Sequence, residues 1–262
     1  MGNPERIPDS LSALLRDIAV GFPAILGANL VGIYLWGSLT YEAFDERYGD
    51  VDCIVVTRKD LAEREFSILD NWFADMSQRN SWVAKLDMRF VIDGEFLDKT
   101  SRCCGFQFGK FVRHGSDGNP FIWINIGDCG VTLWGKDAKL VAPAVDDKCL
   151  SEALLLELNY LKEDLAANAG DRSEKAFQHL AYAILTACRI LYTAYHKALV
   201  SKERALDWAI ATLPSERIPL ITTAMENRRK TKGVKTGQME KDALDFVHFI
   251  EARTRSVLEA KE

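Results

Sequence analysis

Asp50 and Asp52 are the residues of this 262-residue chain whose spacing points most directly to chemistry. They are separated by one residue at the start of an apolar run, so alternation along a strand would point both carboxylates to the same face. Two like charges held together are costly unless a positive partner compensates them, and a divalent cation is the natural partner. Mg²⁺ binds a few carboxylate oxygens, keeps water molecules and completes its shell with substrate phosphates. The pair therefore predicts a magnesium site for a phosphate-bearing substrate.

Gly37 and Ser38 end the preceding apolar run, LVGIYLW at 30–36, and are expected at the same edge as the acidic pair. A glycine there would let a phosphate approach the backbone, and the serine would add an N–H group and a hydroxyl. A structural alternative stays open, in which the segment is a hairpin with a turn at Gly49 and Asp50 and no chemistry.

Asp87 is the candidate third acid. It lies in the otherwise apolar stretch KLDMRFVI at 85–92, where a carboxylate needs a reason. The alternative is an ion pair with Arg89 on the same strand face. Asp93 is a weaker candidate, because it stands beside Gly94 in an expected turn.

Strand-like runs and helical stripes alternate through the first half of the chain, which predicts a mixed sheet covered by helices. The expected strands are 30–36, 52–57, 85–92 and 120–126, and the expected helices follow Ser10 and cover 59–77. Strand signals then disappear, and the remaining stretches have helical periodicity: 150–167, 173–198, 202–212, 217–229 and 239–260. We therefore expect an α+β protein, with a mixed-sheet domain at 1–148 and an all-α helical bundle at 149–262.

Composition excludes several classes of function. The formal net charge of −5 and the pI of about 5.5 are not those of a basic nucleic-acid binder. The six cysteines form no CxxC pair and have no spacing with histidine suited to zinc. No secretory signal or long uninterrupted apolar run is evident, so we expect a cytoplasmic protein without a membrane partner. We also expect a monomer with no nucleic-acid partner. Phosphate-binding P-loop and nucleophile-elbow motifs are also missing from the sequence.

The acidic segment resembles a known signature. Trp36-Gly37-Ser38, eleven intervening residues and then Asp50-Val51-Asp52-Cys53 are similar to the pattern of nucleotidyltransferases related to DNA polymerase β. The stretch LTACRILYTAYHKALVSKERALDWAIATLP at 185–214 resembles the helical domain of aminoglycoside adenylyltransferases of the streptomycin/spectinomycin 3″/9 branch. QFGKF at 107–111 and ALDFVHFIEA near the end resemble two further segments of those enzymes.

The resemblance implies a role for individual residues. Asp50 and Asp52 would hold Mg²⁺, and Asp87 would take the place of the family's glutamate general base. Arg189 and Lys202 match basic residues that reach the ATP phosphates from the helical domain. Without the family, both would be interpreted as ordinary surface charges on amphipathic helices.

Departures from the family pattern bear on the acceptor. Asp87 is one methylene shorter than the expected glutamate, so it could reach less far or serve as a third metal ligand. Phe111 stands where dual-specificity members have tryptophan, and His179 where they tend to have an aspartate that helps to hold streptomycin. Arg228 replaces a tyrosine and opens a basic run, which is either a solvated loop or a phosphate contact. Because streptomycin needs the two lost contacts, spectinomycin is the expected acceptor of the two.

These observations predict Mg²⁺-dependent transfer of AMP from ATP to a hydroxyl of an aminoglycoside or aminocyclitol antibiotic, giving resistance, in a cleft between the two domains. Two alternatives stay open. One is a nucleotidyltransferase of the same fold with another acceptor, such as a lincosamide or a protein hydroxyl. The other is a module that binds a nucleotide or a partner without catalysis.

Overall fold

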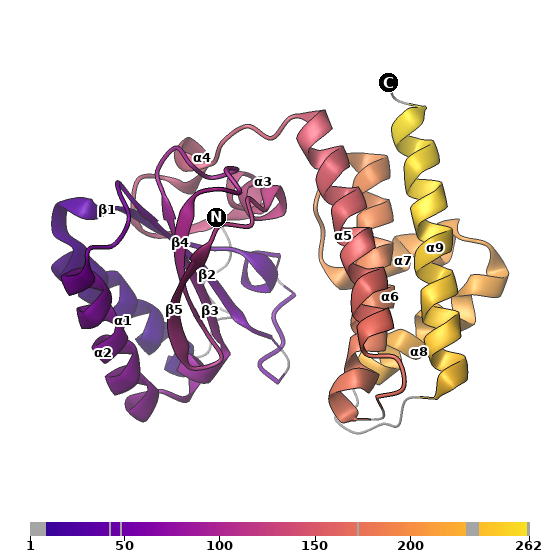
Figure 1. Cartoon of the computed structure of the whole chain (residues 1–262), viewed down its shortest axis with the longest axis horizontal. Coiled ribbons are helices and arrows are strands. Elements are labelled where there is room, and N and C mark those ends of the chain that lie inside the picture. The colour runs from indigo at the N-terminus through magenta and orange to yellow at the C-terminus, as the bar shows by residue number, and fades with distance from the viewer. Residues whose placement is uncertain (1–8, 42, 48, 172, 229–235, 261–262) are drawn as a thin grey trace. The chain divides into compact units, whose positions relative to one another are not determined.

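The computed structural model describes residues 9–41, 43–47, 49–171, 173–228 and 236–260. It has the predicted α+β class and contains two compact units, which span Met1–Val145 and Asp146–Glu262 (Figure 1). The first unit contains the sheet, and the second is helical.

The sheet of the first unit is mixed, as predicted. In the described part of the chain it has six strands in the order β5-β4-β3-β2-β1-β6, and only β2 and β3 pair in parallel. The strands are β1 (Leu30–Leu35), β2 (Val51–Thr57), β3 (Leu86–Ile92), β4 (Arg102–Gln107), β5 (Lys110–Gly115) and β6 (Val131–Gly135). The parallel pair needs a crossover, and α2 (Glu63–Arg79) supplies it.

One face of the sheet is covered by α1 (Asp9–Leu26) and α2, which lie side by side in Figure 1. The buried stripe of α1 includes Leu11, Leu14, Ile18 and Phe22, which join the core beneath these helices. Among the described residues, the segment 9–29 is the one long and apolar enough to cross a membrane by length and composition. Its stripe at helical spacing packs in the core, which accounts for that composition.

The other face is covered over β1 and β2 by α3 (Pro120–Cys129) and the short α4 (Ala138–Val141), with Ile122, Trp123 and Ile126 of α3 in a second core. The prediction of a strand over 120–126 is therefore wrong. Asn119 caps α3 by accepting a hydrogen bond from the Phe121 N–H at 2.9 Å, and Pro120 occupies its first turn. A short, continuous apolar run does not distinguish a buried helix from a strand by periodicity.

Strands β4, β5 and β6 were not predicted. β4 and β5 form a hairpin whose two-residue turn, Phe108 and Gly109, has positive φ at both positions, 53° and 74°. Turns of this kind are usually marked by Asn-Gly or Asp-Gly, so Phe-Gly gave no signal. β5 is exposed along most of its length and has no clear alternation of apolar and polar residues.

The second unit is an all-α bundle, and each helix predicted there is confirmed. The helices are α5 (Asp147–Ala167), α6 (Glu174–His196), α7 (Lys202–Thr212), α8 (Ile218–Arg228) and α9 (Gly237–Glu259). Side chains of Asp146, Ser173, Ser201 and Thr236 cap four of them at the N-terminus. α6 is the central helix, because it packs against α5, α7, α8 and α9.

Candidate active site

The three predicted acids lie at one end of one sheet face. Asp50 directly precedes β2, Asp52 is the second residue of β2, and Asp87 is the second residue of β3. Asp52 and Asp87 are direct partners in the parallel β2–β3 register. Residues paired in this way point to the same side of a sheet, and Asp50 shares that side because it is two positions from Asp52. The arrangement places three carboxylates from two segments on the same side of the sheet.

Gly37 lies directly against one of these carboxylates. Its φ is +73°, and a Cβ built on it would lie only 2.1 Å from Oδ2 of Asp52. The Gly37 N–H donates a 2.9 Å hydrogen bond to Oδ1 of Asn125, while the Trp36 N–H donates to the Asp52 carbonyl at 3.1 Å. The backbone from Gly37 to Leu39 forms one turn of 3₁₀ helix, so Ser38 is placed beside the acidic pair. The Gly37 N–H, which we expected to face a phosphate, therefore already has a partner within the protein.

Asp87 is half-buried and is held by a neutral partner. Nε2 of Gln107, on β4, donates a hydrogen bond of 2.8 Å to Oδ2 of Asp87. Burial raises the pKa of Asp87 and Asp50 raises it further, while Arg89 and the hydrogen bond from Gln107 lower it; the net direction is upward. A carboxylate with a raised pKa, close to a second acid, has the character of a general base.

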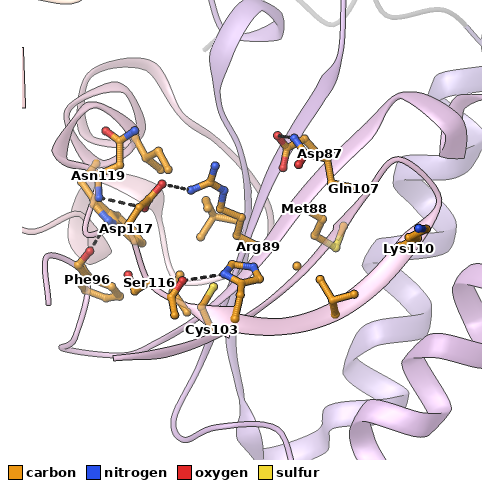
Figure 2. Close-up of a pocket in the computed structure, with 18 of the residues that line it drawn as sticks. Asp87, Met88, Arg89, Phe96, Cys103, Gln107, Lys110, Ser116, Asp117 and Asn119 are labelled. Atoms are coloured by element: carbon orange, nitrogen blue, oxygen red, sulfur yellow. Dashed lines mark hydrogen bonds and ion pairs between the residues drawn. The ribbon is translucent and has the colours of Figure 1, made fainter. Parts of the chain in front are cut away.

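The alternative in which Asp87 and Arg89 form an ion pair is not what the structure contains. The Arg89 guanidinium forms its ion pair with Asp117, in the loop between β5 and α3, as Figure 2 shows. A pocket of about 510 Å³ extends over this part of the sheet, from Asp87 and Gln107 at one end to Asp117 and Trp123 at the other. Helix α3 leaves this half of the face open.

The predicted metal can be tested against the donors present. Among the described residues, no three His, Cys, Asp or Glu side chains lie close enough to hold a metal ion. Mg²⁺ does not need such a cluster, because one or two carboxylates and the oxygens of a bound phosphate suffice. Asp50 and Asp52 offer hard oxygen ligands, and Gly37 leaves the space around Asp52 free of a side chain. The donors fit Mg²⁺ bound together with a nucleotide.

In the second unit, Lys202 lies over an aromatic ring. Nζ of Lys202 lies 4.8 Å from the centre of the Tyr182 ring. Burial raises the pKa of Tyr182 and the charge of Glu157 raises it further, while the charge of Arg189 acts against that rise. Arg228 forms an ion pair of 2.7 Å with Glu203. The rest of its basic run, Arg229, Lys230, Lys232 and Lys235, lies outside the described residues.

The two predicted acceptor contacts fare differently. Phe111 is 7% exposed, and its ring stacks on Phe66 of α2 with centroids 4.5 Å apart. It belongs to the core under α1 and α2, on the sheet face away from Asp87, which corrects its assignment as an acceptor contact. His179 is partly exposed, and its Nδ1 lies 3.3 Å from Oδ2 of Asp164 without hydrogen-bond geometry. The assignment of His179 as an acceptor contact stays a prediction.

Asn125 and Gln107 were missed by the sequence reasoning. Asn125 is 2% exposed and belongs to α3, which was predicted as a strand, so its side chain could not be placed. A single asparagine inside the apolar run FIWINI was the available signal, because a buried amide needs hydrogen-bond partners. Gln107 is an ordinary exposed residue by composition and gave no signal.

Comparisons with known proteins agree with the sequence motifs. Residues 140–253 match the family described as "Aminoglycoside adenylyltransferase, C-terminal domain". A spectinomycin 9-adenylyltransferase of Campylobacter jejuni is 23% identical over 252 residues, which cover 89% of this chain and 92% of the relative. A spectinomycin 9-adenylyltransferase of Staphylococcus aureus is 26% identical over 222 residues, covering 78% and 80%.

A crystal structure of a spectinomycin adenyltransferase from Enterococcus faecialis, solved with ATP and spectinomycin, superposes with a TM-score of 0.69. The identity is 14%, and the match covers 94% of this chain and 98% of the other, so this comparison shows a shared fold. Together, the comparisons confirm the resemblance that the motifs predict.

Proposed function

We infer that this chain is an aminoglycoside adenylyltransferase, and we propose that it transfers AMP from ATP to a hydroxyl of spectinomycin, which confers resistance to that antibiotic. The named relatives support both the reaction and the acceptor, since they are spectinomycin 9-adenylyltransferases and this chain matches them over most of their length. The preference for spectinomycin rests on them rather than on Phe111 and His179. We propose that the enzyme acts in the cytoplasm, where ATP is available.

The observation that carries the proposal is the meeting of Asp50, Asp52 and Asp87 at one edge, with Gly37 against Asp52. Asp50 and Asp52 come from one segment and Asp87 from another, and like charges on one sheet face favour a site that takes a cation. Glycine is favoured there, because its φ is +73° and an added Cβ would lie 2.1 Å from Oδ2 of Asp52 and displace that carboxylate. A nucleotide-binding edge explains both features.

In the proposed reaction, the hydroxyl oxygen of the acceptor attacks the α-phosphorus of ATP while Asp87 accepts the hydroxyl proton, and pyrophosphate leaves. Mg²⁺ held by Asp50 and Asp52 would neutralise the phosphate charge. Ser38 offers its N–H and hydroxyl to a phosphate at the open backbone created by Gly37. Arg189 and Lys202 are assigned to the ATP phosphates by the resemblance.

The proposal is tested with purified protein, Mg²⁺ and ATP, by following pyrophosphate release with a panel of acceptors. We expect turnover with spectinomycin and a lower kcat/KM with streptomycin. Turnover only with a lincosamide or a protein acceptor would replace the proposed acceptor. Nucleotide binding without turnover of any acceptor would favour a non-catalytic module and overturn the proposal.

A further inference from the structure

The proposed base, Asp87, has a neutral hydrogen-bond partner, whereas the cation nearest to it along its strand is bound elsewhere. We propose that Gln107 and Asp117 are positioning residues for Asp87: Gln107 fixes its carboxylate, and Asp117 keeps Arg89 from pairing with it. This inference rests on the proposed function and extends it to two residues that need not touch substrate.

The hairpin determines where Gln107 lies. In the antiparallel β3–β4 register Met88 pairs with Phe106, which places Asp87 and Gln107 opposite each other on the next position. The turn at 108–109 follows at once and pairs Gln107 with Lys110, so the strand end cannot slide. The resulting 2.8 Å bond occupies Oδ2 of Asp87. One carboxylate oxygen is thereby oriented, and the other is left for a substrate proton.

Arg89 would otherwise be the natural partner of Asp87. The two residues are two positions apart on β3, so their side chains leave the same face as neighbours. A guanidinium can bind both oxygens of a carboxylate at once, which would neutralise its charge and make it a weaker base toward a hydroxyl. In Figure 2 the Arg89 side chain instead extends to Asp117, while Asp87 meets Gln107.

Asp117 is itself fixed for this task. Its Oδ1 accepts a 3.2 Å hydrogen bond from the Asn119 N–H, in the turn that leads into α3, and its Oδ2 binds Arg89. The same turn is tied to the sheet, because the Ser116 N–H donates to the Ser101 carbonyl at 2.9 Å. The ion pair is thus anchored at the far end of the pocket from Asp87.

The first test replaces Gln107 by leucine, which has a similar volume and no donor. We expect kcat to fall about tenfold or more, with the KM values for ATP and spectinomycin within about twofold of wild type, because orientation of the base matters only in the chemical step. Gln107 is exposed, so the variant should fold, and thermal unfolding checks this. The matched control is Gln78→Leu, which removes the same amide from an exposed position on α2. A wild-type kcat in Gln107→Leu would overturn the role of Gln107.

The second test releases Arg89. Asp117→Asn should lower kcat about tenfold, because the freed guanidinium can then pair with Asp87. The double variant Asp117→Asn/Arg89→Gln should have the same kcat as Arg89→Gln alone, because no guanidinium remains to pair with Asp87. If Asp117→Asn acted by damaging the loop, the double variant would stay slow. A double variant as slow as Asp117→Asn would overturn the role of Asp117. Wild-type turnover in the same assay separates the two claims: without it the proposed function fails, whereas active wild type with unaffected variants contradicts only the positioning role.

Discussion

Gly37→Ala is the substitution for which the structure gives the most direct expectation. The new Cβ would lie 2.1 Å from Oδ2 of Asp52 and 2.9 Å from its Cγ, far inside van der Waals contact. The Gly37 backbone is held on both sides, by Asn125 and by the Trp36 bond to Asp52, so the carboxylate rather than the main chain should move. Asp52 would then leave the position that it shares with Asp87.

Two effects follow, of different size. An alanine at φ +73° costs about 1–2 kcal/mol of stability, which lowers Tm by several degrees in a protein of this size. Displacing a catalytic carboxylate by about 1 Å costs on the order of a hundredfold in turnover. Activity should therefore fall much more than stability.

The assay is AMP transfer under saturating ATP and acceptor, together with calorimetric unfolding. Gly94→Ala is the matched control, because Gly94 has φ +84° and nothing within 4 Å of its added Cβ. It should lose stability by a similar amount and keep its turnover. If Gly37→Ala retained wild-type turnover, or if both variants lost activity equally, the reasoning about Asp52 would be refuted.

Three further predictions concern separate parts of the chain. Lys202→Ala should weaken ATP binding by about ten- to a hundredfold, because a lost charged contact is worth about 1.5–3 kcal/mol. Unchanged ATP affinity by calorimetry would show that Lys202 is an ordinary surface residue. Phe108→Asn should raise Tm, because Phe108 is 84% exposed at φ +53° before Gly109, where asparagine is favoured; a Tm at or below wild type would contradict this. The hydrogen bond from Lys162 lowers the pKa of Glu251 below 4.5, so the pair stabilises the fold above that pH, and this contribution is lost as the pH falls through the lowered pKa. Glu251→Gln should therefore be less stable than wild type at neutral pH, and the difference in unfolding free energy should shrink in acid. A difference that stays constant with pH would count against the pair.

Much of the candidate site could be predicted because it depends on local periodicity. Alternation along a strand is enough to place Asp50 and Asp52 together, and a single acid in an apolar run is enough to suggest Asp87. Helical stripes with their breakers gave the helices of the second unit for the same reason. These features depend on neighbours in sequence.

The parts that failed depend on contacts between distant segments. The apolar run containing Asn125 fits a strand or a buried helix equally well, and only packing against the sheet decides for α3. The resemblance of QFGKF to a family segment suggests a role for Phe111, but the face to which its side chain points is set by the hairpin register. Gln107 and Asp117 become meaningful only when β4 and the loop before α3 are placed against β3.

The central claim is that the carboxylates around Asp52 carry out AMP transfer to spectinomycin. Mass spectrometry of spectinomycin incubated with ATP, Mg²⁺ and either wild type or Asp52→Asn tests it most directly. We expect the AMP adduct with wild type and none above background with the variant, whose Tm should be equal or higher because a charge leaves a like-charge group. An adduct formed by Asp52→Asn at the wild-type rate would contradict the account.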